Sequence, residues 1–202
     1  IQGSQICLYQ PSGAAISGMV RNVIGTGIKP QAWTGNDKLN CQIEALWEEW
    51  ISKDNCDITG QQSFYEMQAM LLRRKIVDGE ILVKKVVSRR GKFPLRLQII
   101  KSDLLDSQLL FAPKSNHVIR SGIELNDQLK PLAYWLDKKS PDGYVQFDPE
   151  RVPADRIIHL WTKNQPDQIR GMSDLTPIIK RLKDTQDYLD AEASVVSFSI
   201  AL

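Results

Sequence analysis

The spacing of the hydrophobic residues changes at Asp78–Gly79, and this change constrains the fold more than any other feature of the sequence. Before this point, apolar residues recur every three or four positions, which is the spacing of amphipathic helices. After it, short apolar runs alternate with polar or Gly/Pro-rich breaks, and helical spacing returns only near the end of the chain. Strands with such short connections pair antiparallel. The pattern therefore predicts an α+β fold, with N-terminal helices packed on a mainly antiparallel sheet and a long C-terminal helix.

The same patterns give approximate boundaries for these elements. Helices are expected over residues 14–24, 37–53 and 62–77, and the C-terminal helix over 176–202. Strands are expected over residues 81–87, 95–101, 118–125, 131–136, 144–147 and 156–161.

The stretch RNVIGTGIKPQA, residues 21–32, contains a GTG that could belong to a phosphate loop or to the end of a helix. A phosphate loop follows a strand and opens a helix, whereas this one follows a helical pattern. Pro30 also lacks the backbone N–H that a phosphate would need there. We therefore interpret Gly25, Gly27 and Pro30 as the signals that stop the first helix.

One side of the expected helix over residues 37–53 is entirely apolar and includes Trp47 and Trp50. Such a stripe predicts a place in the core or at a contact between subunits. The same interpretation applies to the tryptophans elsewhere in the chain, rather than a role in stacking on nucleic-acid bases. These are Trp33, Trp135 and Trp161.

The C-terminal helix is expected to begin with Thr176 as its N-cap and Pro177 in its first turn. Its basic residues precede its acidic residues, which is the order that the helix dipole disfavours. We therefore expect something outside the helix to compensate these charges. The residues concerned are Lys180, Arg181 and Lys183, followed by Asp187, Asp190 and Glu192.

Composition excludes several classes of protein. The 202 residues carry a formal net charge of +2, which argues against a histone-like binder of nucleic acid. No apolar run approaches the roughly 20 residues of a membrane-spanning helix. The first ten residues have neither the basic leader nor the apolar core of a signal peptide. They also lack an initiating methionine, so we expect the chain to be part of a longer polypeptide.

The cysteines and histidines do not show the spacing of a metal site. Cys7, Cys41 and Cys56 are far apart and form no CxxC pair, which predicts reduced thiols in a cytosolic protein. His117 and His159 have no nearby cysteine or carboxylate at zinc-ligand spacing. We expect His159, which alternates with apolar residues, to be a partly buried structural residue or to face solvent rather than to bind a ligand, and we predict no metal or cofactor.

The segment VDGEILVKK is the feature that most resembles an active site. Asp78 and Glu80, with Lys84 and Lys85, could serve a magnesium-dependent nuclease, because the metal needs oxygen ligands and the leaving group needs a cation. In a strand, however, Glu80 and Lys84 would lie about 13 Å apart. The alternative interpretation is a tight turn into an edge strand with solvated charges.

The order of several motifs carries more information than any one of them. The motifs are VRNVIGTGIKPQA (20–32), IEALWEEW (43–50), VDGEILVK (77–84), LRLQIIKSDLLD (95–106), IRSGIELNDQLKPLAYWL (119–136), VPADRIIHLW (152–161) and QIRGMSDLTPIIKRLKDTQDYLDAE (168–192). This succession closely resembles the lambda-type family of tailed-phage portal proteins. Gly79, Gly171 and Pro177 lie within the matching motifs.

The resemblance implies a structural subunit with no catalytic residue in this region. Portal proteins of this family form a ring, typically a dodecamer, at one vertex of the capsid. Double-stranded DNA moves through the ring, the terminase motor and capsid contact it, and head–tail joining proteins dock to it. Residues 1–175 would correspond to the wing and residues 176–202 to a helix leading towards the stem. The expected location is the virion, and the host cytoplasm during assembly.

Two other functions remain open from the sequence. One is the magnesium-dependent phage nuclease or DNA-processing enzyme described above. The other is a virion interaction module that docks to other proteins without enclosing DNA. Ring formation by the complete protein would separate this module from a portal subunit. Near-neutral charge fits a portal, because a strongly basic channel would grip the DNA that must slide through it.

Overall fold

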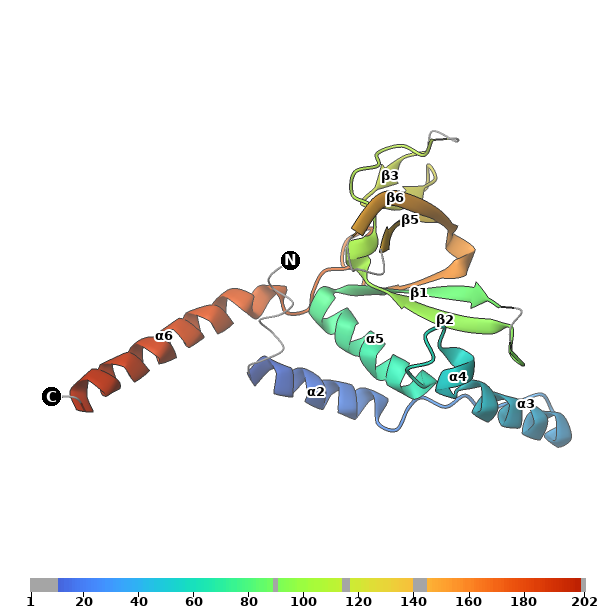
Figure 1. Cartoon of the computed structure of the whole chain (residues 1–202), viewed down its shortest axis with the longest axis horizontal. Helices are drawn as coiled ribbons and strands as arrows, with labels where there is room; N and C mark the ends of the chain where they lie inside the picture. The colour runs from blue at the N-terminus through green and yellow to red at the C-terminus, as the bar shows by residue number, and fades with distance from the viewer. Residues whose placement is uncertain (1–10, 89–90, 114–116, 140–144, 201–202) are drawn as a thin grey trace.

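The computed structural model of the chain describes residues 11–88, 91–113, 117–139 and 145–200. Cys7 and Tyr144, which the sequence patterns included, lie outside these ranges. Helices occupy the N-terminal part, strands follow, and a helix ends the chain, so the predicted α+β order is confirmed (Figure 1). The helices are α2 (Pro11–Ile24), α3 (Asp37–Trp50), α4 (Lys53–Cys56), α5 (Phe64–Asp78) and α6 (Thr176–Ile200), with short 3-10 turns η1 (Ser102–Leu104) and η2 (Ala154–Arg156).

Local capping explains where α3 and α5 begin. The side chain of Asn36 accepts hydrogen bonds from the backbone N–H groups of Lys38 and Leu39 at the start of α3. Ser63 and Glu66 form a reciprocal capping box at the start of α5. The helix predicted over residues 37–53 ends earlier, at Trp50, and α4 follows it as a separate short helix.

The strands form two sheets, whereas the sequence predicted one. The first sheet has the order β2-β1-β7, and the second has the order β3-β4-β5-β6; all their pairings are antiparallel. The strand predicted over 118–125 is in fact a hairpin, because Ser121 and Gly122 both take positive φ values, 48° and 81°. Two adjacent residues of this kind make a tight hairpin turn. The bounds are β1 (Glu80–Val87), β2 (Leu95–Ile100), β3 (Ile119–Arg120), β4 (Ile123–Leu125), β5 (Pro131–Lys139), β6 (Val145–Pro153) and β7 (Ile157–Trp161).

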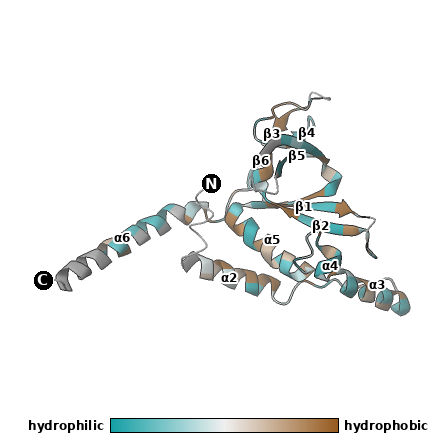
Figure 2. Ribbon diagram, viewed as in Figure 1, coloured by the Kyte–Doolittle hydropathy of each residue, from teal (hydrophilic) through white to brown (hydrophobic). Residues whose placement is uncertain are grey.

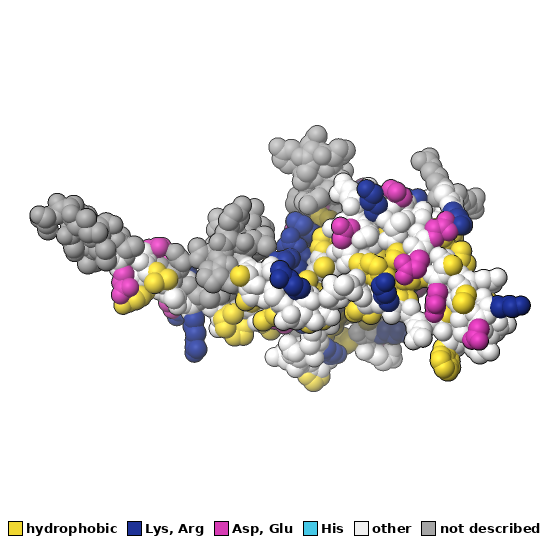
Figure 3. Space-filling view, turned by 90° about the horizontal axis from the view of Figure 1, so that it is seen from below, with side chains coloured by type: hydrophobic (Ala, Val, Ile, Leu, Met, Phe, Trp, Pro, Cys, Tyr) yellow, Lys and Arg dark blue, Asp and Glu magenta, His cyan; other side chains and the backbone are white. Residues whose placement is uncertain are grey.

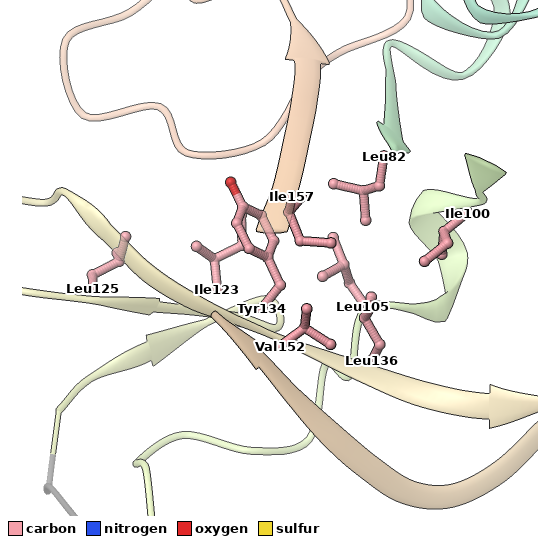
Figure 4. Packing of buried hydrophobic residues seen from close by; sticks show 9 residues of the cluster. All are labelled: Leu82, Ile100, Leu105, Ile123, Leu125, Tyr134, Leu136, Val152 and Ile157. Carbon is pink, nitrogen blue, oxygen red and sulfur yellow. The ribbon is translucent and has the colours of Figure 1, made fainter. Parts of the chain in front are cut away.

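The main hydrophobic core fills the space between the two sheets. Figure 4 shows its side chains converging from strands of both sheets and from the segment around η1. Burial of such side chains contributes roughly 1.5–3 kcal/mol each, so this core joins the sheets into one unit. Its members are Leu82, Ile100, Leu105, Ile123, Leu125, Tyr134, Leu136, Val152 and Ile157.

Helix α5 lies on the other face of the first sheet, and a second layer of helices lies beyond it. Ile76 and Val77 of α5 pack with Ile16 and Val20 of α2 and with Leu175, which immediately precedes α6. Helix α6 then leaves the body and projects to the side opposite α3 (Figure 1). Within the described ranges, no helix has the length and apolar character needed to cross a membrane. Cys41 and Cys56 are free thiols, the former exposed and the latter buried.

Candidate functional site

Glu80 lies where α5 passes into β1, and two glycines shape this position. Gly79 ends α5 in the left-handed conformation with a φ of 87°, which favours a residue without a Cβ. The backbone of residues 171–173 passes directly beside it. A Cβ on Gly171 would lie 2.2 Å from the carbonyl oxygen of Gly79, and a Cβ on Gly79 would lie 2.3 Å from the carbonyl carbon of Met172. The glycines thus let the segment that leads into α6 lie against the start of β1.

Both carboxylate oxygens of Glu80 accept hydrogen bonds. Arg170 Nε donates to Oε1 at 2.6 Å, and the backbone N–H of Gly171 donates to Oε2 at 2.8 Å. Nε2 of His159, on β7, lies 2.9 Å from Oε2. We call these contacts of Glu80, His159, Arg170 and Gly171 the α6 junction.

Burial and hydrogen bonding have opposite effects on the pKa of Glu80. The residue is only 3% exposed, and this burial alone would raise its pKa. The hydrogen bonds from His159 and Arg170, the charge of Arg170 and the N–H of Gly171 outweigh burial and lower the pKa below its ordinary value. Glu80 is therefore a buried carboxylate held in its charged form.

Arg170 connects the junction to the rest of the body. Its Nη1 donates to the carbonyl oxygen of Ser121, in the β3–β4 turn, at 2.8 Å. Its Nη2 donates to the carbonyl oxygen of Ser102, in η1, at 3.1 Å. The guanidinium has several donors in one rigid plane, and here they span both sheets.

The residues after Gly171 fasten the same segment to the end of α5. The hydroxyl of Ser173 and the backbone N–H of Asp174 both donate to the carbonyl oxygen of Ile76, at 3.2 Å each. This carbonyl lies in the last turn of α5, where it has no partner within the helix. The carboxylate of Asp174 accepts from Lys75 Nζ at 2.8 Å. The start of α6 is therefore tied to both α5 and β1.

His159 links the junction to the second sheet. Its side chain is 5% exposed, and its Nδ1 lies 3.4 Å from the hydroxyl oxygen of Tyr134, on β5. Burial, with a further contribution from the charge of Glu80, raises the pKa of Tyr134 to about 12. The predicted structural role of His159 agrees with this position between the sheets.

The structure corrects the sequence interpretation of the Asp78–Lys85 segment. β1 is the central strand of its sheet rather than an edge strand, and Glu80 is buried rather than solvated. Asp78 pairs with Arg74 at 3.5 Å, and Lys84 pairs with Glu150 at 3.1 Å. Among the described residues, no three His, Cys, Asp or Glu side chains are grouped so that they could hold a metal ion. The arrangement of Glu80 is that of a buried structural ion pair.

A second buried carboxylate, Glu124 on β4, occupies the second sheet. Arg151 donates to it through Nε at 2.7 Å and through Nη2 at 3.1 Å. Trp135 Nε1 donates at 3.2 Å, and His117 Nδ1 lies 3.0 Å away. The hydrogen bond from Arg151 is the main cause that lowers the pKa of Glu124 to about 2. This cluster fixes the register of the β4, β5 and β6 strands.

The remaining glycines and prolines singled out in the sequence lie apart from the junction. Gly25 and Gly27 follow α2 with φ values of 56° and 106°. A Cβ on Gly27 would lie 2.1 Å from the ring of Tyr65, so this loop packs closely on α5. Pro30 continues the same loop, and Pro177 is the second residue of α6. Only Gly79 and Gly171 are brought together by the fold.

The charged residues singled out on α6 are all exposed. Lys180, Arg181 and Lys183 precede Asp187 and Asp190 along the part of α6 that stands away from the body (Figure 1). Figure 2 shows that hydrophilic residues dominate this part of the helix. The fold thus presents these side chains outward from α6, at a distance from Glu80.

Sequence reasoning missed the role of Arg170, Glu124 and Arg151. Arg170 and Glu80 each adjoin a glycine that the motifs had singled out, and this was the one available signal. The pair is separated by most of the strand region, so no periodic pattern could connect its members.

Comparison with known proteins supports one family. The model of a family described as phage portal protein, lambda family, matches residues 10–196. A probable portal protein of Halomonas phage phiHAP-1 is 30% identical over 161 residues, which cover 78% of this chain. The aligned region covers 31% of that relative, so this chain spans about a third of its length.

Proposed function

The chain belongs to the lambda family of phage portal proteins, which is structural and not enzymatic, and we propose that it forms the wing of a portal subunit. Residues 1–175 would be the wing, and residues 176–202 would begin the helix that leads towards the stem. The family match over residues 10–196 is the observation that carries this proposal.

The complete protein would assemble with further copies into a closed ring, a dodecamer by analogy with its family. The ring would occupy one vertex of the capsid, where double-stranded DNA enters and leaves without sequence-specific contacts. Terminase, capsid and head–tail joining proteins would dock to it. The family implies a location in the virion, and assembly would take place in the host cytoplasm.

The α6 junction fits the mechanical role of such a subunit. A helix that extends from a body transmits position only if its base cannot pivot. At the base of α6, Arg170 contacts Glu80, Ser102 and Ser121, while Asp174 contacts Lys75. These contacts would hold α6 in a set direction relative to the wing.

The exposed charges of α6 suit contacts outside the subunit. Lys180, Arg181 and Lys183 would meet an acidic surface of the next subunit or line the channel. Asp187 and Asp190 lie further along the same helix, where the adjacent copy could present its basic residues. Such pairing would compensate the charge order that the helix dipole disfavours.

The magnesium-dependent nuclease has less support than the portal subunit. Glu80, which would have to bind the metal, already accepts hydrogen bonds on both oxygens. The fold is also compatible with a virion interaction module that does not enclose DNA. Ring formation by the complete protein would distinguish a portal subunit from such a module.

Reversing the basic charges of α6 tests the proposal. The variant Lys180→Glu/Arg181→Glu/Lys183→Glu is introduced into the full-length protein, and the yields of rings and of DNA-filled capsids are measured. The yield of filled capsids should fall by at least about tenfold, because like charges brought together at an interface cost several kcal/mol. The matched control reverses three exposed cations on the body, Lys101, Arg120 and Lys130. Unchanged assembly and packaging in the α6 variant would refute this role of the helix.

A further inference from the structure

Helix α3 is attached to the body along one side and leaves an apolar side exposed. Trp47 packs on Phe64 of α5, with ring centroids 5.2 Å apart. Leu39, Ile43 and Leu46 are each more than 40% exposed, and none of the residues of α3 is buried. These three residues, which we call the α3 face, occupy positions i, i+4 and i+7 and share one side of the helix. In the view onto the helical layer, hydrophobic side chains are exposed among acidic ones (Figure 3).

A second apolar surface lies on β7. The helix α5 packs mainly over β1, so Ile81 and Val83 of that strand are 1% and 3% exposed. Their neighbours on β7, Leu160 and Ile158, face the same side but are 36% and 42% exposed. Among the described residues, the α5 side of β7 is therefore only partly covered, although a sheet face normally packs against another element.

An open groove of about 380 Å³ runs beside this partly covered strand. Helices on a sheet pack with axes about 8–10 Å apart, so a helix lying over β7 would pack beside α5. We call this hollow the β7 groove, and its lining includes Ile24, Leu71, Leu72, Lys75, Leu160 and Trp161.

The α3 face and the β7 groove belong to opposite edges of the same sheet. α3 is joined to the β2 edge, where Trp50 Nε1 donates to the carbonyl oxygen of Leu95 at 2.8 Å. The strand order β2-β1-β7 places the groove at the other edge. A single copy therefore cannot bring the two surfaces together, whereas adjacent copies arranged head to tail can.

The charges around the two surfaces have opposite signs. α3 carries four acidic residues and one lysine along its length, Asp37, Lys38, Glu44, Glu48 and Glu49. Glu48 and Glu49 pair with Lys29 and Lys92 of the same chain at exposed positions, which leaves Asp37 and Glu44 as the acidic side chains without such an ion pair among the described residues. Lys75 in the β7 groove already pairs with Asp174, so the cations offered to a partner are Arg156 and Lys163, which are exposed and flank β7 at its two ends. Complementary charge of this kind steers two surfaces into one orientation.

We propose that the α3 face of one copy of this chain docks into the β7 groove of the next copy. Apolar anchors at i, i+4 and i+7 of a helix, set in a hydrophobic groove, are a recurring mode of recognition. This contact uses a different surface on each partner, so its repetition generates a ring or a helical array rather than a twofold dimer. The inference rests on the proposed function, because it identifies the wing contacts of the proposed ring.

Cysteine crosslinking in the full-length protein tests the contact. Cys7 and Cys41 are first replaced by serine, and then Ile43→Cys and Leu160→Cys are introduced together. Oxidation of the assembled protein should give a ladder of covalent multimers. Coassembly of subunits that carry only Ile43→Cys with subunits that carry only Leu160→Cys should give covalent dimers and no larger species. The control pair is Ile43→Cys with Leu110→Cys, which should give no ladder. Leu110 is exposed in the segment that lies beside β3.

The outcomes separate this inference from the proposed function. If rings form but the Ile43–Leu160 pair gives no more crosslinking than the control pair, the contact is refuted and the portal role stands. If the unsubstituted protein forms no rings at all, the proposed function fails first. A second variant, Ile43→Glu, should reduce the fraction of protein in rings while leaving the unfolding temperature unchanged, because this side chain is exposed in the single chain. Full ring yield for Ile43→Glu would also overturn the inference.

Discussion

Glu80 and Glu124 are buried carboxylates that remain charged because each one is paired with an arginine from a distant part of the chain. Arg170 approaches Glu80 from the segment before α6, and Arg151 approaches Glu124 from β6. A buried charge of this kind is costly when it is left alone and acceptable when its lone pairs are satisfied. These residues therefore fix the arrangement of elements.

Replacing Arg170 should destabilise the chain more than its own exposure suggests. Arg170→Met leaves Glu80 buried without its cation, and removing one partner of a buried pair costs about 3–5 kcal/mol, less here because Arg170 is partly exposed. Urea unfolding at neutral pH measures this loss. Arg156→Met, at an exposed arginine, is the control and should change stability by at most about 0.5 kcal/mol.

The same variant should show a defined dependence on pH. In the native chain the pKa of Glu80 is lowered, so its contribution to stability is present at neutral pH and is lost as the pH falls through that lowered value. Arg170→Met removes the hydrogen bond and the charge of Arg170, two of the causes that lower the pKa of Glu80, so this pKa is higher in the variant than in the native chain and the carboxyl group becomes neutral at a higher pH. The difference in unfolding free energy between the two proteins should therefore shrink as the pH falls from 7 towards 4. A difference that is constant over this range would contradict the pairing.

At the scale of elements, the contact between α5, β1 and the start of α6 depends on close backbone packing as well as on side-chain hydrogen bonds. Gly79→Ala places a Cβ against the backbone of Met172 and Ser173, which must move to accommodate it. Gly25→Ala is the matched control, since its φ is also positive but no atom lies closer than 4.0 Å. The control should cost about 1 kcal/mol of backbone strain, and Gly79→Ala should cost clearly more.

Hydrogen exchange locates the damage from this substitution. The backbone N–H of Asp174 donates to the carbonyl oxygen of Ile76, so its exchange should become faster in Gly79→Ala and stay unchanged in Gly25→Ala. Equal exchange rates in the two variants would show that the glycine contact does not hold the base of α6.

Local signals made the helices predictable, and their absence explains the errors in the sheet. Gly79 and the Ser63–Glu66 capping box mark helix ends through interactions within a few residues. The division into two sheets depends on the turn at Ser121–Gly122 and on which strands pair across long separations. Ser121 has a positive φ, which is uncommon for serine and cannot be predicted from its residue type. One continuous strand over residues 118–125 was therefore expected, and this prediction was wrong.

The candidate site was harder to predict than the fold for a related reason. A glutamate at the start of a strand is normally exposed. The cation that pairs with the buried Glu80 is Arg170, which lies at the other end of the sheet region in the sequence. The sequence analysis singled out Gly79 and Gly171, which permit this approach, but it did not predict that they contact each other. Conversely, the apolar stripe over residues 37–53 was expected in the core or at a subunit contact. Its Trp50 and Ile51 pack on the body, whereas Leu39, Ile43 and Leu46 are exposed. Trp33, expected in the core or at an interface, is 90% exposed.

At the scale of the whole molecule, the chain consists of a body with two unlike sides and a helix that leaves it. The α3 face lies at one edge of the first sheet and the β7 groove at the other, while α6 projects away from the body. Two different surfaces on opposite sides allow head-to-tail association, which closes into a ring when the rotation per subunit permits. The portal proposal requires this closure.

The mass and shape of the full-length protein test that claim most directly. Light scattering gives the number of subunits in solution, and negative-stain imaging shows whether the particle has a central hole. The account predicts a closed ring of many subunits with an open axis. A protein that remains a monomer or dimer at high concentration would contradict it.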